Sequence, residues 1–97
     1  MKYKIIVAPL ALEDLKYDRA YDRAMIKDII KKHLSHQPTK TSKSLVKRLT
    51  GVAKPQYRLK VGDYRIFYDV VENEVHVLAV IPKSQASEWL EREGRKL

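Results

Sequence analysis

The sequence predicts an α+β domain in which helices pack against a mostly antiparallel four-stranded sheet. Three observations predict this class. The C-terminal half holds three runs that are rich in β-branched and aromatic residues and are separated by short turns. The N-terminal half holds apolar residues at helical spacing. The chain has 97 residues, so we expect residues 1–97 to form one domain with a single modest core.

The N-terminal part predicts one strand followed by two helices. Residues 3–7 form a β-branched run that is typical of a strand. Pro9 suits the first turn of a helix that we expect to run to about Tyr17. A second helix, capped by Asp18 or Asp22, follows. Its predicted buried stripe, at the spacing i, i+3, i+4, i+7 and i+8, consists of Ile26, Ile29, Ile30, His33 and Leu34.

The middle of the chain is predicted to be irregular. Residues 39–44 are polar and basic, which indicates a loop. Residues 45–49 contain three apolar side chains, which predict either one helical turn or an irregular packed segment. Residues 51–55 begin with glycine and end with proline, so we expect another loop there.

The C-terminal half predicts three strands and a closing helix. Gly62-Asp63 places glycine first in a two-residue loop, as a type II′ hairpin turn requires. Pro82 is expected to end the last strand, and Ser84 to cap a helix that runs through Arg92 and stops at Gly94. The predicted strands span 56–61, 64–71 and 75–81, which gives the order β-α-α-β-β-β-α.

The two-residue loop also fixes which side chains of the hairpin share a face, because side chains alternate along a strand. Lys60 then lies opposite Arg65, where like charges repel, and an anion bound between them would relieve that repulsion. The predicted core face carries Tyr57, Leu59, Val61, Tyr64, Ile66, Tyr68 and Val70, with Val75, Val77, Ala79 and Ile81 from the next strand. The other face carries Arg58, Lys60, Arg65, Phe67 and Asp69, with His76, Leu78 and Val80.

The charge balance favours an anionic partner. Lys and Arg number 20 against 12 Asp and Glu, which gives a net charge of +8. Nine of these cations fall between Ile29 and Gly62, a span without a single acid. The absence of cysteine excludes disulfides and thiol catalysis. No apolar run approaches the length of a membrane span, so we expect a cytoplasmic protein with no membrane partner.

The hairpin from Arg58 to Val70 resembles the signature hairpin of the RelE/ParE toxin superfamily, the toxin halves of bacterial type II toxin–antitoxin pairs. Upstream, Lys47-Arg48-Leu49-Thr50-Gly51 resembles the family's K-x-L-x-G approach to that hairpin. The resemblance implies a RelE-like toxin that binds mRNA in the ribosomal A site and cuts it. That cleavage needs no metal or cofactor, because the 2′-OH of the RNA attacks the adjacent phosphate.

The resemblance also implies roles for individual residues. Arg65 and Arg58 would grip the phosphate and stabilise its developing charge. Lys60 would do the same or accept a proton, and Lys83 would replace a cation that the family brings from its last helix. Phe67 is the candidate for stacking on a base. The full set of candidate RNA-binding residues is Lys47, Arg48, Lys54, Phe67, His76 and Ser84.

Histidine chemistry has two interpretations here. His76 is expected near Asp69, where the pair would form either a general base or a simple cross-strand contact, and the contact is the simpler interpretation. The three histidines do not share the spacing of metal ligands, so we expect no metal site. Trp89 and Leu90 are expected to dock the last helix onto the sheet.

Two other functions stay open. RelE-type nucleases bring an arginine and an aromatic or histidine from the last strand and helix, but this chain has Ser84 and Leu90 there. The sequence is also compatible with a non-catalytic ParE-like inhibitor of DNA gyrase, or with a catalytically weak RNA-binding homologue. Every toxin interpretation implies an acidic antitoxin whose segment wraps the basic surface or displaces the final helix.

Overall fold

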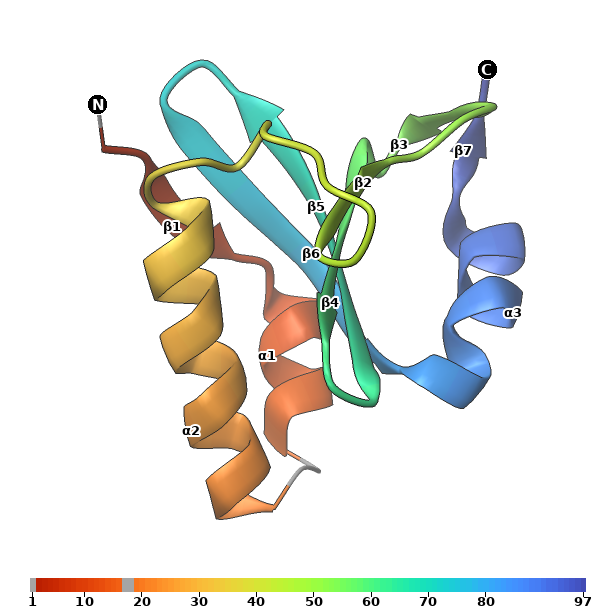
Figure 1. The fold of residues 1–97 in the computed structure, drawn as a ribbon. Coiled ribbons are helices and arrows are strands. Elements are labelled where there is room, and N and C mark those ends of the chain that lie inside the picture. The colour runs from red at the N-terminus through yellow and green to blue at the C-terminus, as the bar shows by residue number, and fades with distance from the viewer. Residues whose placement is uncertain (1, 17–18) are drawn as a thin grey trace.

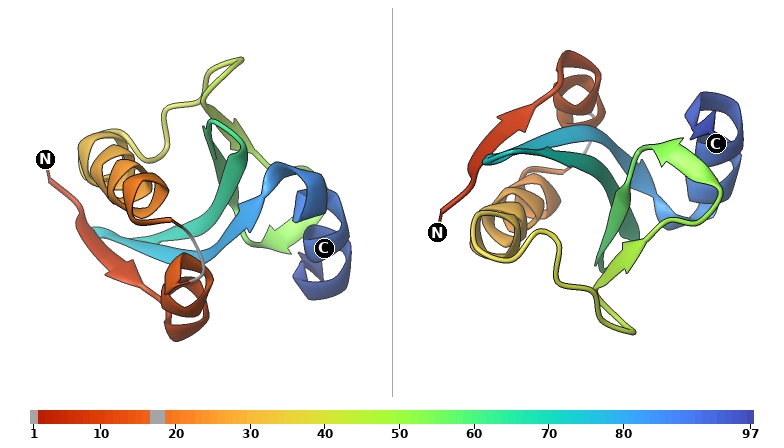
Figure 2. Two further views of the ribbon diagram at one scale, coloured as in Figure 1. Left: turned by 90° about the horizontal axis from the view of Figure 1, so that it is seen from below. Right: turned by 90° about the horizontal axis from the view of Figure 1, so that it is seen from above.

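The computed structural model describes residues 2–16 and 19–97 and has the α+β architecture that the sequence predicts (Figure 1). Helices lie on both sides of one curved sheet (Figure 2). In chain order the elements are β1 (Lys4–Val7), α1 (Pro9–Lys16), α2 (Ala20–Ile29), the π-helical turn η1 (Ile30–Leu34), β2 (Val46–Arg48), β3 (Val52–Lys54), β4 (Tyr57–Val61), β5 (Tyr64–Val71), β6 (Glu74–Pro82), α3 (Lys83–Glu93) and β7 (Arg95–Lys96).

The main sheet has five strands in the order β1-β6-β5-β4-β2, one more than predicted. Only the β1–β6 pairing is parallel, and the other three pairings are antiparallel. The extra strand is β2, in the segment expected to be a helical turn or irregular. It pairs with β4, and the main-chain N–H of Lys60 extends that contact by donating to the Leu45 carbonyl at 2.9 Å. Pairing with β4 satisfies main-chain groups that would otherwise face water at the sheet edge.

A second departure lies in the predicted loop over residues 51–55. There, β3 pairs with β7 at the C-terminal end of the chain to form a separate two-stranded ribbon. The main-chain N–H of Leu97 adds a bond of 3.2 Å to the Gly51 carbonyl. This ribbon holds the C-terminal end of α3 beside the main sheet (Figure 1).

The register predicted for the central hairpin is confirmed. Lys60 lies opposite Arg65, and the pairing continues to Tyr57 opposite Tyr68. Gly62 has a φ of 52°, the left-handed value that glycine adopts without strain at the first position of a type II′ turn.

A β-bulge in β6 overturns the face assignment of the residues beyond it. Phe67 lies opposite Ala79, whereas the next residue, Tyr68, lies opposite Val77, so Leu78 is the extra residue. One extra residue moves every later side chain to the other face. Ala79 and Ile81 therefore share a face with Phe67, and Val80 points into the core, the reverse of the prediction.

Each face of the sheet has its own apolar cluster. The main core lies between the sheet, α1 and α2, and includes Ile26, Leu59, Ile66 and Tyr68 among its buried residues. The smaller cluster lies under α3, and we call it the α3-side cluster. Its members are the buried Phe67, Ala79 and Ile81 and the partly buried Leu49, Ala86, Trp89 and Leu90.

Several local predictions need correction. His33 is exposed and not on the buried stripe, because the wider turn of η1 shifts the helical phase. Arg19, not Asp22, occupies the N-cap position of α2, and among the described residues no side chain caps that helix. Tyr17 and Asp18 lie outside the described residues. Helix α3 begins at Lys83 after Pro82, without a side-chain cap from Ser84.

No helix within residues 2–16 or 19–97 combines the length and the apolar character that crossing a membrane requires.

Candidate functional site

Cations from three different segments gather on one face of the sheet. Lys47 of β2, Arg58 of β4 and Phe67 of β5 lie in one cross-strand row, and Lys60 and Arg65 lie in the next. Cross-strand partners project to the same side of a sheet, so these four cations share a face. We call Lys47, Arg58, Lys60 and Arg65 the basic face.

Arg65 is held against the hairpin turn. Arg65 is only 7% exposed. Its Nη1 donates hydrogen bonds to the carbonyls of Gly62 and Tyr64, each at 2.9 Å. These two bonds fix the guanidinium in place instead of letting it extend into solvent. A guanidinium fixed before a ligand arrives loses less side-chain entropy on binding.

Arg58 carries an unpartnered donor. Its Nε is buried and has no hydrogen-bond partner among the described residues. Burial lowers the pKa of Arg58, and the charge of Arg65 lowers that pKa further. A buried donor without an acceptor costs about 1–3 kcal/mol, so an anionic oxygen that reached this group would recover that cost. The site is therefore suited to binding an anion.

The start of α3 adds a fifth cation at the hairpin end of the basic face. The main-chain N–H of Lys83 donates to the Asp63 carbonyl at 2.6 Å, which fixes the helix start at the hairpin turn. Lys83 and Ser84 are exposed and, with Asp63 and Pro82, line an open hollow of about 480 Å³. Lys60, on the adjoining strand, is exposed as well.

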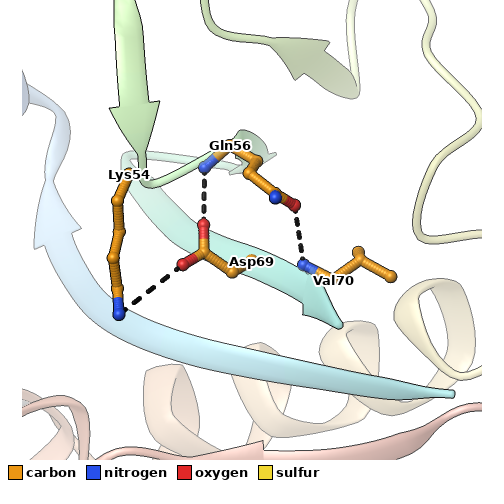
Figure 3. Close-up of polar contacts among 4 residues, drawn as sticks. All are labelled: Lys54, Gln56, Asp69 and Val70. Carbon is orange, nitrogen blue, oxygen red and sulfur yellow. Dashed lines mark hydrogen bonds and ion pairs between the residues drawn. The ribbon is translucent and has the colours of Figure 1, made fainter. Parts of the chain in front are cut away.

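Two predicted RNA-binding cations lie elsewhere. Arg48 follows Lys47 in β2 and points to the opposite face, where its guanidinium lies 5.0 Å from the centre of the Tyr57 ring. Lys54 is the last residue of β3, before β4 begins, and its Nζ lies 3.9 Å from Oδ2 of Asp69 (Figure 3). The structure therefore brings Lys47 together with Arg58, Lys60 and Arg65, but not Arg48 or Lys54.

Phe67 is on the predicted face but is not exposed, which corrects the expectation of an open stacking surface. It is 2% exposed and stacks on Trp89 of α3, with ring centres 4.8 Å apart and planes 14° from parallel. Trp89 thus occupies the position that a base would take. The sequence indicated that Trp89 docks α3, but it did not show which ring it covers.

His76 and Asp69 do not form a general base. They are opposite each other in the β5–β6 register, yet Nε2 of His76 contacts Oε1 of Glu74 at 3.0 Å. Asp69 instead accepts a hydrogen bond of 2.7 Å from the main-chain N–H of Gln56, and the Gln56 side chain accepts one of 2.9 Å from Val70 (Figure 3). The sequence analysis did not identify Gln56. Its main-chain and side-chain hydrogen bonds to Asp69 and Val70 end the β4–β5 pairing.

The buried tyrosine of the hairpin is not placed for proton transfer on the basic face. Tyr68 lies in the main core and donates a hydrogen bond of 2.6 Å to the Pro38 carbonyl. Burial raises its pKa, and the neighbouring Tyr57 raises it further. Among the residues that the structure describes, no three His, Asp or Glu side chains gather as a metal site requires.

Comparisons with known proteins agree with this architecture. The family model described as ParE toxin of the type II toxin–antitoxin system, parDE, matches residues 5–87. No curated protein matches the sequence at a significant level.

Solved structures match the fold over most of the chain. The RelB–RelE antitoxin–toxin complex from Methanococcus jannaschii matches with 24% identity and a TM-score of 0.67, over 87% of this chain and 96% of that chain. The E. coli DinJ–YafQ toxin–antitoxin complex matches with 14% identity and a TM-score of 0.64, over 90% and 97% of the two chains. A mutant of the E. coli toxin RelE in the free state matches with 20% identity and a TM-score of 0.59, over 94% and 93%.

Proposed function

The chain belongs to the ParE toxin family of type II toxin–antitoxin systems, and from this premise we propose that it is a toxin that cleaves mRNA on the ribosome. The observation that carries the proposal is the basic face, where the buried Nε donor of Arg58 has no acceptor among the described residues and lies beside the fixed guanidinium of Arg65. A scissile phosphate would supply the missing acceptor. We infer a cytoplasmic site of action and an acidic antitoxin as the regulating partner.

The chemistry proposed is attack within the RNA. The 2′-oxygen forms a bond to the adjacent phosphorus while the bond from phosphorus to the 5′-oxygen breaks. This yields a 2′,3′-cyclic phosphate and a 5′-hydroxyl. The proton of the 2′-OH leaves with the attack, and the departing 5′-oxygen gains one. No metal or cofactor is needed, because negative charge on the phosphate oxygens is met by preorganised cations.

Arg58 and Arg65 would bind the non-bridging phosphate oxygens, since guanidinium groups donate two hydrogen bonds to such oxygens. Lys60 and Lys83 are exposed at the edge of the same site and would add positive charge. Lys47 would hold a flanking phosphate, because it lies in the same cross-strand row as Arg58.

The proposal assigns charge stabilisation, and not proton transfer, to these residues. Ser84 and Leu90 stand where the nucleases that the chain resembles bring an arginine and an aromatic residue. Losing one general acid–base contribution typically slows a reaction by about 10²–10⁴-fold, so we expect cleavage to be slow.

The test incubates the purified protein with ribosomes programmed with an mRNA and maps new RNA ends. We expect ends at the codon in the A site, and their loss in Arg65→Ala. Arg92→Ala is the matched control, because Arg92 is an exposed arginine of α3 that forms an ion pair with Glu93 at 3.4 Å. Intact mRNA with a wild-type protein that still arrests growth would overturn the proposal.

Inhibition of DNA gyrase is the second candidate function. Membership of the ParE toxin family favours this function. Ser84 and Leu90 also favour it, because they stand where the nucleases bring an arginine and an aromatic residue. It predicts loss of DNA supercoiling in the presence of the protein while mRNA stays intact. A supercoiling assay run beside the ribosome assay separates the two functions.

A further inference from the structure

A cleft of about 680 Å³ lies between α1 and α3, where both helices border β6. The two helices stand apart from each other (Figure 2). Strand β1 pairs with β6 only as far as Val77, so no strand of the sheet covers this edge of β6 beyond that residue. There, Oδ2 of Asp14 in α1 accepts a hydrogen bond of 3.0 Å from the main-chain N–H of Val80. This bond fixes the Asp14 side chain in the wall of the cleft.

The floor of the cleft is apolar. Leu78, the extra residue of the β-bulge, is partly exposed and lines the cleft beside the buried Ala79 and Ile81. Bulges often redirect a side chain next to a functional site. In the walls, Leu10 of α1 is 75% exposed and Trp89 of α3 is partly exposed. Apolar surface is therefore available to a ligand that enters between the helices.

The charge of the cleft is opposite to the net charge of the chain. The described residues that line it include three acids, Asp14, Glu88 and Glu93, and one cation, Arg92. Arg92 is paired with Glu93 at 3.4 Å, whereas the exposed Glu88 carboxylate has no hydrogen-bond or ion-pair partner among the described residues. Negative charge thus remains in the cleft of a chain whose net charge is +8. It repels phosphate groups and attracts a cationic ligand.

Helix α3 separates this cleft from the basic face. Gln85, Glu88 and Arg92 recur at helical spacing and line the cleft. Leu90 and Glu91 lie on another flank of α3, toward the segment that links β2 to β3. The cations of the basic face lie on β2, β4 and β5. The molecule therefore presents two surfaces of opposite charge, one on each side of α3.

We propose that the cleft binds a basic segment of a ribosomal protein, in which lysine or arginine side chains flank an apolar one. This inference rests on the proposed action on the ribosome and adds a second contact there. The apolar stems of the basic side chains would lie along Leu10 and Leu78, with their charged ends at Asp14 and Glu88. A guanidinium would also be attracted to the Trp89 ring.

Charge complementarity favours this occupant over RNA. Proteins that bind RNA carry basic segments, so a toxin bound to ribosomal RNA meets such segments beside it. Phosphates would occupy the basic face while a basic segment occupies the cleft. Two contacts of opposite charge also hold the toxin in one orientation, because a reversed orientation would bring like charges together.

A charge reversal distinguishes this contact from general attraction to RNA. The probe is the purified ribosome programmed with an mRNA, and cosedimentation measures its affinity for the toxin. An added lysine tightens binding to anionic RNA, so weaker binding of Glu88→Lys requires a cationic group near Glu88. We expect Glu88→Lys to weaken binding by about fivefold or more.

Glu91→Lys is the matched control, because Glu91 is an exposed acid of α3 that does not line the cleft. We expect this variant to bind as tightly as the wild type or more tightly. Undiminished binding by Glu88→Lys, or equal weakening by both variants, overturns the proposal.

Leu10→Ser tests the apolar part of the cleft. Leu10 is exposed, so we expect the fold to keep its stability while ribosome affinity falls by about fivefold. The control is Tyr21→Ser, which removes a side chain of α2 that is 79% exposed and lies outside the cleft. Equal affinities for the two variants overturn the proposal.

The cleavage rate separates this inference from the proposed function. Neither Glu88 nor Leu10 belongs to the basic face, so both variants should keep the maximal single-turnover rate within about twofold at saturating toxin. Cleavage with the same ribosome affinity for every variant overturns docking in the cleft and leaves mRNA cleavage standing. Weaker ribosome binding by Glu88→Lys, with no cleavage by any protein, supports the docking and contradicts mRNA cleavage.

A crosslink identifies the class of partner. A photoreactive benzophenone side chain in place of Leu10 would lie at the mouth of the cleft when the toxin is bound to purified ribosomes. We expect it to react with a basic segment of a ribosomal protein. Crosslinks to ribosomal RNA alone, or none, overturn the proposal.

Discussion

The two faces of the five-stranded sheet are covered to different depths. On one face, α1 and α2 enclose the main core, to which both contribute fully buried residues. On the other, α3 has no fully buried residue and covers only Phe67, Ala79 and Ile81. Since stabilisation scales with the apolar area buried, the α3 side contributes less to stability. The basic face lies on this thinly covered side, where Lys47 and Lys60 are exposed while Arg65 is buried against the hairpin turn.

The largest effect is expected in the main core. Ile66 is fully buried there, so we expect Ile66→Ala to lower the free energy of unfolding by about 2–5 kcal/mol. Urea denaturation followed by circular dichroism measures the change. A loss below about 1 kcal/mol would contradict the description of this face as the main source of stability.

Removal of the stacking partner on the other face should cost less. Trp89 is only partly buried, and its stack on Phe67 is its main aromatic contact. We expect Trp89→Ala to lower the free energy of unfolding by about 1–2 kcal/mol and to expose Phe67. The same denaturation experiment measures this loss. A loss equal to that of Ile66→Ala would contradict the conclusion that the α3 side contributes less to stability than the main core.

Tyr68 is expected to make the free energy of unfolding depend on pH. Its pKa is raised in the folded protein, so the neutral phenol is the form that folding favours. The stability that this contributes is fully present below the ordinary pKa of 10.0 and is lost as pH rises above it toward the folded value. We expect unfolding free energy to fall above pH 10 by up to about 1.4 kcal/mol per pH unit from this group.

The variant Tyr68→Phe isolates that contribution. It should flatten the fall in stability above pH 10, and below that pH it should cost about 1–2 kcal/mol, because the Pro38 carbonyl loses its donor. Stability measured from pH 8 to 11 checks both results. An unchanged slope above pH 10 would mean that other groups govern the alkaline side.

The smallest effect on stability is expected at Arg58, where function and stability oppose each other. Arg58→Met removes a buried donor for which the described part of the chain offers no acceptor, so we expect stability to stay the same or rise by about 1 kcal/mol. The same variant should lose mRNA cleavage. A clear loss of stability would show that Arg58 has a structural role in place of a ligand-binding one.

Local patterns in the sequence predicted the central hairpin well. The two-residue loop at Gly62-Asp63 admits one register, and alternation then places Arg58, Lys60 and Arg65 on one face. The sequence could not show the bulge at Leu78, because residues 77–81 are all apolar and give no alternation from which to read a face.

Two further errors concern contacts that are set by the tertiary structure. The sequence did not show that Trp89 covers Phe67, nor that β3 pairs with β7 beyond the end of α3, because neither short strand has a distinct sequence pattern. The sequence also did not show that His76 contacts Glu74, while the Asp69 carboxylate accepts a hydrogen bond from the Gln56 main chain. Such competition for a partner is set by the tertiary structure and not by residue spacing.

The proposed role of the basic face is to stabilise the charge on an RNA phosphate. The most direct measurement is the single-turnover rate of mRNA cleavage on programmed ribosomes for the wild type, Arg58→Ala and Arg92→Ala. We predict that Arg58→Ala lowers the rate by about 10²-fold or more, and that Arg92→Ala leaves it within about twofold. Equal rates for all three proteins would contradict the claim.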